Sequence, residues 1–195
     1  MLEWLLLAVY WCTGFTLKLG DDFLDFLNEP MLSLLPLGFS GFSFGLLMTY
    51  SEWDLVLLTA ILIGVVVSGK VNRPQFLIGF ILIGAVLLVN GLPVISDLFT
   101  WFTILVALLL AAVVDEIQND RADSDQETLV SKFFLYRFTL KIAVLVLSLL
   151  WPGFLLAALG LWMFDFGYEI AGWLARRFRD EHEMQDYSTR QQKLG

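Results

Sequence analysis

The sequence predicts an all-α polytopic membrane protein: a bundle of about seven transmembrane helices, with the N-terminus outside and the C-terminus in the cytoplasm. The first observation is composition, because 58% of the 195 residues are hydrophobic, with seventeen Phe and seven Trp, and the mean hydropathy is +0.74. Soluble globular domains do not have this composition. The second is the length of the apolar runs, and the third is the placement of the basic residues.

Seven apolar segments approach the roughly 20 residues that a helix needs to cross a bilayer. In chain order they are 2–19, 31–50, 54–69, 75–91, 94–114, 132–151 and 154–174. Turn-forming residues separate them, among them Asn28 to Pro30, Gly69 to Pro74 and Pro152-Gly153. The segment 31–50 contains three glycines and is expected to be the least regular helix, although small residues also allow close packing in lipid. We expect residues 1–175 to form the bundle and 176–195 a polar cytoplasmic tail.

The basic residues set the orientation of the bundle. If the segments alternate in direction, residues 20–30, 70–74, 115–131 and 175–195 share one side of the membrane. All twelve basic residues lie on that side or in the adjacent half of the membrane: Lys18, Lys70, Arg73, Arg121, Lys132, Arg137, Lys141, Arg176, Arg177, Arg179, Arg190 and Lys193. By the positive-inside rule this side is cytoplasmic.

A first acidic motif follows the first apolar segment and consists of four residues, Asp21, Asp22, Asp25 and Glu29. On a helix that continues past Gly20 these side chains form one stripe. Like charges at this spacing repel, and hard divalent cations such as Mg2+ bind carboxylate oxygens of this kind. The motif therefore predicts a divalent metal site, and its alternative interpretation is an acidic helix end in a solvated loop.

A second acidic motif, DEIQNDRADSDQETL, runs from Asp115 to Leu129 after the fifth apolar segment. As in the first motif, several of its polar residues fit one helical face, with Asp115 and Asp125 nearby: Glu116, Asn119, Asp120, Asp123 and Glu127. The alternative is a polar connecting loop, because Asp and Asn are also common helix caps. Between the two motifs, SGKVNRPQF places Lys70 and Arg73 at the same membrane face. Both are suited to phosphate oxygens, but basic residues here also serve to set topology.

Two pairs of opposite charges are predicted inside the bundle. Arg137 and Lys141 are four residues apart in the sixth apolar segment, and Asp165 and Glu169 are four apart in the seventh. Across the Pro152-Gly153 turn, Lys141 and Asp165 lie at matching depths of about 15 Å, and Arg137 and Glu169 match nearer the surface. We expect these residues to form structural ion pairs, because charges inside a membrane pair or face water.

Other chemistries are not indicated. Cys12 is the single cysteine and His182 the single histidine, which disfavours disulfides and thiol- or histidine-ligated metals. No Walker-type loop or Gly-x-Ser-x-Gly motif is found. The formal net charge of −8 gives no basis for a nucleic-acid partner.

The two acidic motifs resemble those of the UbiA-type intramembrane prenyltransferases. Asp21-Asp22-x-x-Asp25-x-x-x-Glu29 is similar to the first family motif, with Asp in place of the leading Asn and Glu in place of the last Asp. NDRADSDQETLVSKF is similar to a shortened second motif and, as in the family, follows four helices later. The resemblance implies a helical bundle with a cavity open to the cytoplasm and to lipid, an integral location in the cell membrane, and an active site that faces the cytoplasm.

The resemblance also implies a function and roles for individual residues. The reaction would be Mg2+-dependent transfer of an isoprenyl group from a prenyl diphosphate to a lipophilic acceptor. The partners of the protein would be membrane lipid and either a second copy of the chain or another membrane protein. The implied roles are catalytic for Asp22, Asp25, Asp120 and Lys70, metal-binding for Asp21, Asp22, Asp25, Glu29, Asp120 and Asp123, and diphosphate-binding for Lys18, Lys70, Arg73 and Arg121. The alternatives are a non-enzymatic transporter or cation-binding or assembly subunit, and hydrolysis or cyclisation of a lipid diphosphate.

Overall fold

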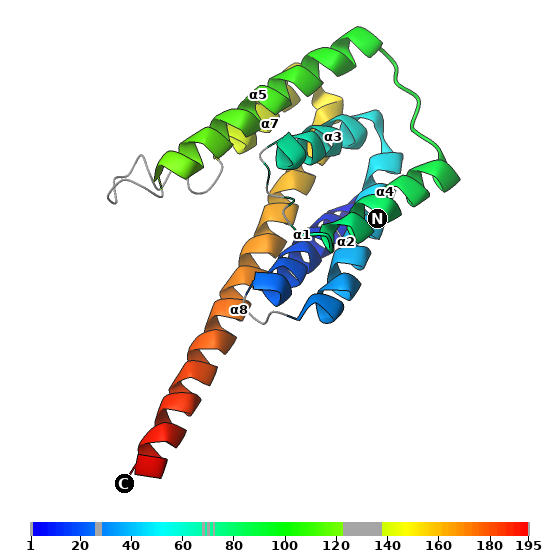
Figure 1. Ribbon diagram of the computed structural model, residues 1–195. Helices are drawn as coiled ribbons and strands as arrows, with labels where there is room; N and C mark the ends of the chain where they lie inside the picture. Colours follow the sequence, from blue (N-terminus) through cyan, green and yellow to red (C-terminus); the bar gives the residue numbers. More distant parts are fainter. Residues whose placement is uncertain are drawn as a thin grey trace.

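A computed structural model describes residues 2–25, 29–67, 69, 71, 73–122 and 138–194; within these ranges, the side chains of residues 116–122, 138 and 179–194 are not described. The described residues form seven α-helices and one short 3-10 helix (Figure 1). In chain order these are α1 (Leu2–Asp25), α2 (Pro30–Tyr50), α3 (Glu52–Val67), α4 (Phe76–Asn90), α5 (Leu98–Ala122), α7 (Phe138–Leu150), η1 (Pro152–Phe154) and α8 (Leu155–Leu194).

The predicted all-helical class is confirmed, and each of the seven apolar segments coincides with a helix. Among the described residues, four stretches are long and apolar enough to cross a membrane: Leu2–Asp25, Pro30–Tyr50, Leu98–Asp115 and Pro152–Phe178. Phe76–Asn90 and Thr139–Leu150 are apolar but shorter. This set of helices is consistent with a membrane protein.

Two boundaries differ from the sequence-based expectation. The tail that was expected after residue 175 continues α8 without a break to Leu194, because no proline or glycine interrupts residues 173–194. Helix α5 likewise runs past the apolar segment 94–114 and ends at Ala122, inside the second acidic motif. The expected segment 132–151 begins outside the described residues, and its described helix begins at Phe138.

Residue contacts give the relative directions of the helices. Helix α1 is antiparallel to α2, because Gly20 meets Leu37 whereas Thr13 meets Ser40. The first and last helices, α1 and α8, are parallel and pack closely, since Gly14 lies against Phe164 and Lys18 lies further along against Gly172. Alternation along the chain also makes α2 parallel to α4, and α3 parallel to α5.

Glycine allows the closest helix contacts. A Cβ at Gly14 would overlap the carbonyl oxygen of Phe164, and a Cβ at Gly167 would overlap that of Trp11, so α1 and α8 touch through their backbones. In α2, Gly41 lies against the backbone of Gly79 in α4. The glycines that lowered the expected regularity of segment 31–50 are therefore contact points, and the helix they belong to is continuous from Pro30 to Tyr50.

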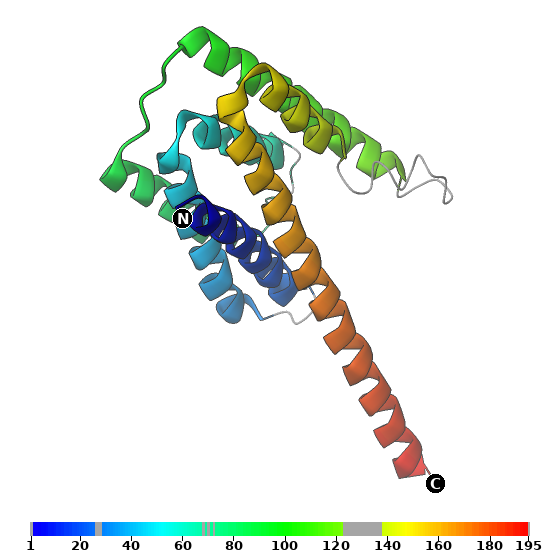
Figure 2. The same cartoon turned by 180° about the vertical axis from the view of Figure 1, so that it is seen from behind.

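The buried side chains form two clusters. One joins α3, α5, α7 and the first part of α8 around Leu57, Leu108 and Phe154. The other joins α1, α2, α3, α4 and α8 around Tyr10, Leu47 and Phe164. Opposite views show α5 and α7 side by side on one flank, and α8 extending beyond the rest of the molecule (Figures 1 and 2). Helices α3 and α8 contribute to both clusters and hold the two flanks together.

Candidate functional site

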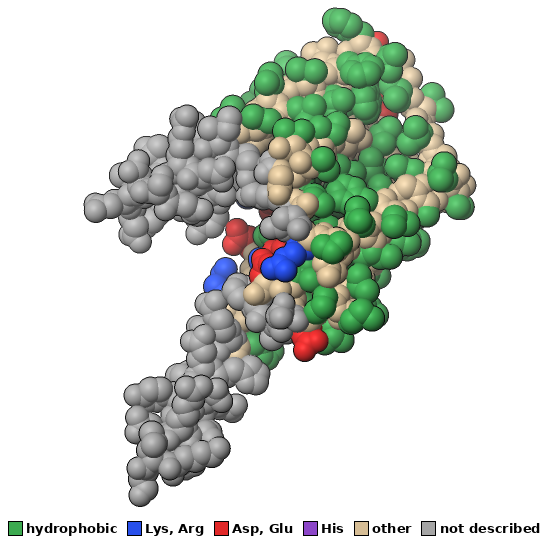
Figure 3. Space-filling view, in the orientation of Figure 1, with side chains coloured by type: hydrophobic (Ala, Val, Ile, Leu, Met, Phe, Trp, Pro, Cys, Tyr) green, Lys and Arg blue, Asp and Glu red, His purple; other side chains and the backbone are tan. Residues whose placement is uncertain are grey.

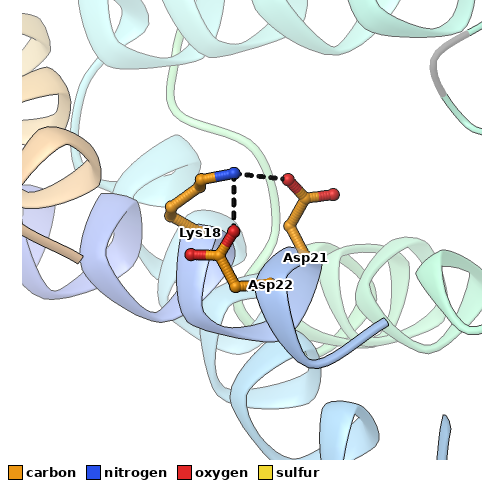
Figure 4. Close-up of polar contacts among 3 residues, drawn as sticks. All are labelled: Lys18, Asp21 and Asp22. Atoms are coloured by element: carbon orange, nitrogen blue, oxygen red, sulfur yellow. Dashed lines mark hydrogen bonds and ion pairs between the residues drawn. The ribbon is translucent and has the colours of Figure 1, made fainter. Parts of the chain in front are cut away.

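The last turns of α1 bring together three members of the predicted site, Lys18, Asp21 and Asp22 (Figure 4). Lys18 Nζ lies 3.0 Å from Asp21 Oδ2 and 2.8 Å from Asp22 Oδ1. The two carboxylates are three and four residues after the lysine, the spacings at which side chains meet on a helix. The ammonium group therefore lies between the first two carboxylates of the first acidic motif.

Asp22 is a buried carboxylate with few polar partners in the described part of the chain. The residue is 3% exposed. Neither of its oxygens accepts a hydrogen bond within the described part of the chain, so its contact is the ion pair through Oδ1, and Oδ2 has no partner there. Buried polar oxygens are paired in the great majority of cases, and a buried charge without enough partners is costly. Asp22 Oδ2 is thus a buried acceptor that a ligand could satisfy.

Helix α8 supplies the other wall of this site. The ring of Tyr168 lies 5.4 Å from Lys18 Nζ, within the range of a cation–π contact. Gly172 leaves room for the lysine stem, since a Cβ there would lie 3.4 Å from Lys18 Cε. Arg176, one turn further, is close enough for its charge to act on the Asp22 carboxylate. Tyr168 and Arg176 were not among the predicted site residues, because the parallel contact of α1 with α8 is not visible in the sequence.

The described side chains of the first motif do not complete a metal site. Asp25 and Glu29 are exposed, and no group of three acidic, histidine or cysteine side chains in the described residues is placed to hold a metal ion. Carboxylate oxygens are nevertheless the donor type that Mg2+ prefers, and Asp22 Oδ2 has no hydrogen-bond partner among the described residues. The first motif can therefore contribute ligands to a cation, but other groups must complete its coordination.

Much of the second half of the predicted site lies outside the described residues. This holds for the side chains of Asp120 and Arg121 and for all of Asp123 and Lys70. Arg73 is described and is exposed just before α4. Asp115 at the start of the motif is 2% exposed and accepts hydrogen bonds from the backbone N–H groups of Thr139 at 3.0 Å and Leu140 at 2.7 Å. It caps α7, which is the role that the alternative interpretation assigned to acidic residues here.

The two acidic motifs belong to helices that do not pack on each other. Helix α5 contacts α3 and α7, and in the described part of the chain it makes no contact with α1. Helix α8 packs against both α1 and α7. Figure 3 shows most charged side chains of this face gathered where α8 leaves the hydrophobic body.

The structure brings together one of the two expected ion pairs. Lys141 Nζ in α7 lies 2.9 Å from Asp165 Oδ2 in α8, with side chains 12% and 24% exposed. The ring of Trp162 lies 5.9 Å from the same nitrogen. The second expected pair cannot be assessed in this way, because Arg137 lies outside the described residues, while Glu169 is exposed.

A third buried carboxylate, Asp54 at the start of α3, was not predicted. It is 1% exposed, and its partner Tyr10 in α1 is fully buried. The Tyr10 hydroxyl donates a hydrogen bond of 2.6 Å to Asp54 Oδ1, and the Ser51 hydroxyl donates one to Asp54 Oδ2. An acidic residue inside an apolar segment is a signal to search for such donors, but the sequence does not say where they are.

Comparison of the chain with family models, with curated proteins and with solved structures found no match.

Proposed function

We propose that the chain is an integral membrane protein that transfers an isoprenyl group from a prenyl diphosphate to a lipophilic acceptor, with Mg2+, at a cytoplasmic site between the end of α1 and the middle of α8. The observation that carries this proposal is Asp22. It is a carboxylate 3% exposed, one oxygen of which has no partner in the described part of the chain, and it belongs to the motif that resembles the prenyltransferase motif.

The surroundings of Asp22 suit a ligand with a charged head and an apolar tail. Lys18 and Arg176 place two positive charges beside the carboxylates, and both groups donate hydrogen bonds to phosphate oxygens. The body of the protein exposes large apolar side chains, among them Phe166 and Trp173 on α8. An isoprenoid chain can lie against such a surface while its diphosphate lies at the charged end.

Each residue of the site has a role in this proposal. Lys18 and Arg176 bind and orient the diphosphate, with Lys70, Arg73 and Arg121 as further proposed contacts. Asp21 and Asp22 from the first motif, and Asp120 and Asp123 from the second, are the proposed cation ligands, with Asp25 and Glu29 nearby. When bound, Mg2+ would neutralise the diphosphate and make it a better leaving group. The apolar side chains exclude water, which favours the lipophilic acceptor over hydrolysis.

One observation favours a second function, that of a non-enzymatic membrane protein. Lys18 already neutralises part of the first motif, and the described residues contain no group of three metal ligands. In that case the cluster stabilises the end of α1 and binds no prenyl diphosphate. This alternative covers a transporter or a cation-binding or assembly subunit.

A binding titration distinguishes the two. The purified protein is titrated with geranylgeranyl diphosphate or its nonreactive thio-analogue, with and without Mg2+, beside Asp22→Asn and Asp120→Asn. Asp97→Asn, an exposed carboxylate in the loop before α5, is the matched control. Saturable Mg2+-dependent binding that both site variants lose and the control keeps supports the prenyltransferase; binding that is absent or unaffected contradicts it.

Product analysis then separates the chemistries that share such a site. Transfer gives a prenylated acceptor and free diphosphate in equal amounts. Hydrolysis or cyclisation releases diphosphate without any acceptor. Release that does not depend on an added acceptor would therefore replace the transferase proposal with one of these two reactions.

A further inference from the structure

Lys18 occupies the position where a cation bound by the first acidic motif would be expected. Its Nζ is 3.0 Å from Asp21 Oδ2 and 2.8 Å from Asp22 Oδ1. A divalent cation that used these two oxygens would come close to the ammonium group, and two positive charges at such a distance repel strongly away from bulk water. Lysine and metal therefore compete for the same two carboxylates.

We infer that Lys18 is an internal counter-cation, which keeps a free divalent cation out of the first acidic motif until a phosphate group arrives to bind the lysine. The inference rests on the proposed function, because it assigns the motif to a divalent cation and a phosphate-bearing ligand. It goes beyond that proposal by giving an order of events: the phosphate and the cation bind together, and the cation alone binds poorly.

The burial of Asp22 supports an exchange of partners over a permanent ion pair. A lysine that served only to neutralise the carboxylate would leave Oδ2 without a partner, at a cost that native structures usually avoid. In the described residues that oxygen is unpaired on a side chain 5% exposed. A cation that binds through Oδ2 would satisfy it, and Asp22 is therefore the residue that gains most from the exchange.

The surroundings of Lys18 allow it to move without leaving the site. Its side chain passes Gly172, which has no side chain to restrict it, and its ammonium group lies near the face of Tyr168. The side chain is 19% exposed, so part of it reaches solvent or the headgroup layer. An unbranched four-carbon stem turns more freely than the planar guanidinium of arginine. A phosphate oxygen near Tyr168 can thus take over the ammonium group from the carboxylates.

Mn2+ binding to the full-length protein in detergent tests the inference without any catalytic assay. Mn2+ is paramagnetic, and its free concentration can be read from its resonance signal. The variants are Lys18→Gln, Lys18→Arg, Lys18→Gln with Asp22→Asn, and Lys141→Gln as the matched control. Lys141 is also paired with one carboxylate, Asp165, but lies in α7 away from the motif. Thermal unfolding of each variant identifies any that has lost its fold.

Lys18→Gln should bind Mn2+ about tenfold more tightly than the wild type in the absence of phosphate, the size of a typical coupling between two sites. The additional Asp22→Asn change should remove this gain, and Lys18→Arg and Lys141→Gln should resemble the wild type. An excess of inorganic phosphate should raise the Mn2+ affinity of the wild type and have less effect on Lys18→Gln.

The inference is wrong if folded Lys18→Gln binds Mn2+ no better than the wild type, or if Lys141→Gln gains as much. Its failure is distinct from failure of the proposed function. Transfer activity together with unchanged Mn2+ binding in Lys18→Gln would contradict the counter-cation role of Lys18 and support the prenyltransferase function. Tighter Mn2+ binding in Lys18→Gln without any transfer or prenyl diphosphate binding would support the counter-cation role and contradict the prenyltransferase function.

Discussion

Two buried carboxylates at different places in the molecule differ in how they are satisfied. Asp54 is 1% exposed and accepts hydrogen bonds through both oxygens, from Tyr10 and Ser51. Asp22 is 3% exposed and accepts none in the described residues, with a single ion pair to Lys18. Asp54 connects α1 to α3 through neutral donors that hold it in place. Asp22 depends on a flexible cation that a ligand can replace.

The comparison shows that burial of a carboxylate does not by itself indicate whether the carboxylate binds a ligand. A carboxylate whose oxygens are all paired gains nothing from a ligand, and removing a donor leaves it unsatisfied. A carboxylate with a free oxygen pays part of its burial cost in the ligand-free state and regains it on binding. Asp54 is thus satisfied within the protein, whereas the proposed function gives Asp22 a ligand, and the following experiments test this difference.

The largest effect is expected at the α1–α8 interface, on which both carboxylates depend. Gly14→Ala places a Cβ against the carbonyl oxygen of Phe164 and should cost about 3 kcal/mol or more of stability, because backbone cannot move aside as a side chain can. Thermal or detergent unfolding measures this. The control is Gly84→Ala, where no atom lies within 4 Å of the added Cβ; equal stability of the two variants would contradict the close packing of α1 on α8.

The second effect concerns the donor of Asp54. Tyr10→Phe leaves the carboxylate without one of its hydrogen bonds in a buried position, and should cost about 1–3 kcal/mol. The same unfolding measurement on Tyr50→Phe, an exposed tyrosine at the end of α2, should show a change within about 0.5 kcal/mol. If the Tyr10→Phe protein were as stable as the control, the structural role proposed for Asp54 would be contradicted.

A smaller stability effect is expected for Asp22→Asn. The amide removes a buried charge, its oxygen still lies against the ammonium group of Lys18, and Asp21 remains 3.0 Å from that group, so the cost should be about 1 kcal/mol or less. Asp54→Asn should cost more, because its NH2 group would face a hydroxyl donor. Unfolding of the two variants side by side measures this order, and the reverse order would break the comparison.

The smallest effect concerns Asp97, an exposed carboxylate that caps α5. Hydrogen bonds from the Thr100 hydroxyl and the Phe99 backbone lower the pKa of Asp97 below its ordinary value of 3.8. A lowered folded-state pKa means that the stabilisation is present above pH 3.8 and is lost as pH falls through the folded-state pKa.

Asp97→Asn is the matched variant for this pH dependence, since asparagine caps a helix equally well and does not titrate. The difference in unfolding temperature between the wild type and Asp97→Asn should be constant at neutral pH and change below pH 3.8 in favour of the variant. A difference that does not vary with pH would show that the cap does not depend on the charge of Asp97.

The helices could be predicted from the sequence because each depends on a local property. Apolar runs of sufficient length and the turn residues between them locate all seven. The polar composition after residue 175 predicts the end of the apolar segment but not the end of the helix, and α8 continues to Leu194. Composition tells whether a helix is in lipid, whereas continuity depends on the absence of breakers between Trp173 and Leu194.

The site could be predicted only where its contacts are local. Lys18 with Asp21 and Asp22 follows from helical spacing alone, and this signal was available in the sequence. The contact between Lys141 and Asp165 follows from the short connection between α7 and α8. Tyr168, Arg176 and the link from Tyr10 to Asp54 depend on which helices pack together, which is decided by glycine contacts between segments far apart in the chain.

The parallel contact of α1 with α8 can form only late in biosynthesis, after the ribosome has added α8. About 130 residues separate the end of α1 from the start of α8, which the ribosome needs roughly 7 to 26 seconds to add at 5–20 residues per second. During that time Gly14 has no α8 to cover it, and the surface that carries Lys18 and Asp22 has only one of its walls. The nascent chain therefore acquires both walls of the charged site only when α8 has been translated, so that a product truncated before α8 would keep the six described helices that precede it without that site.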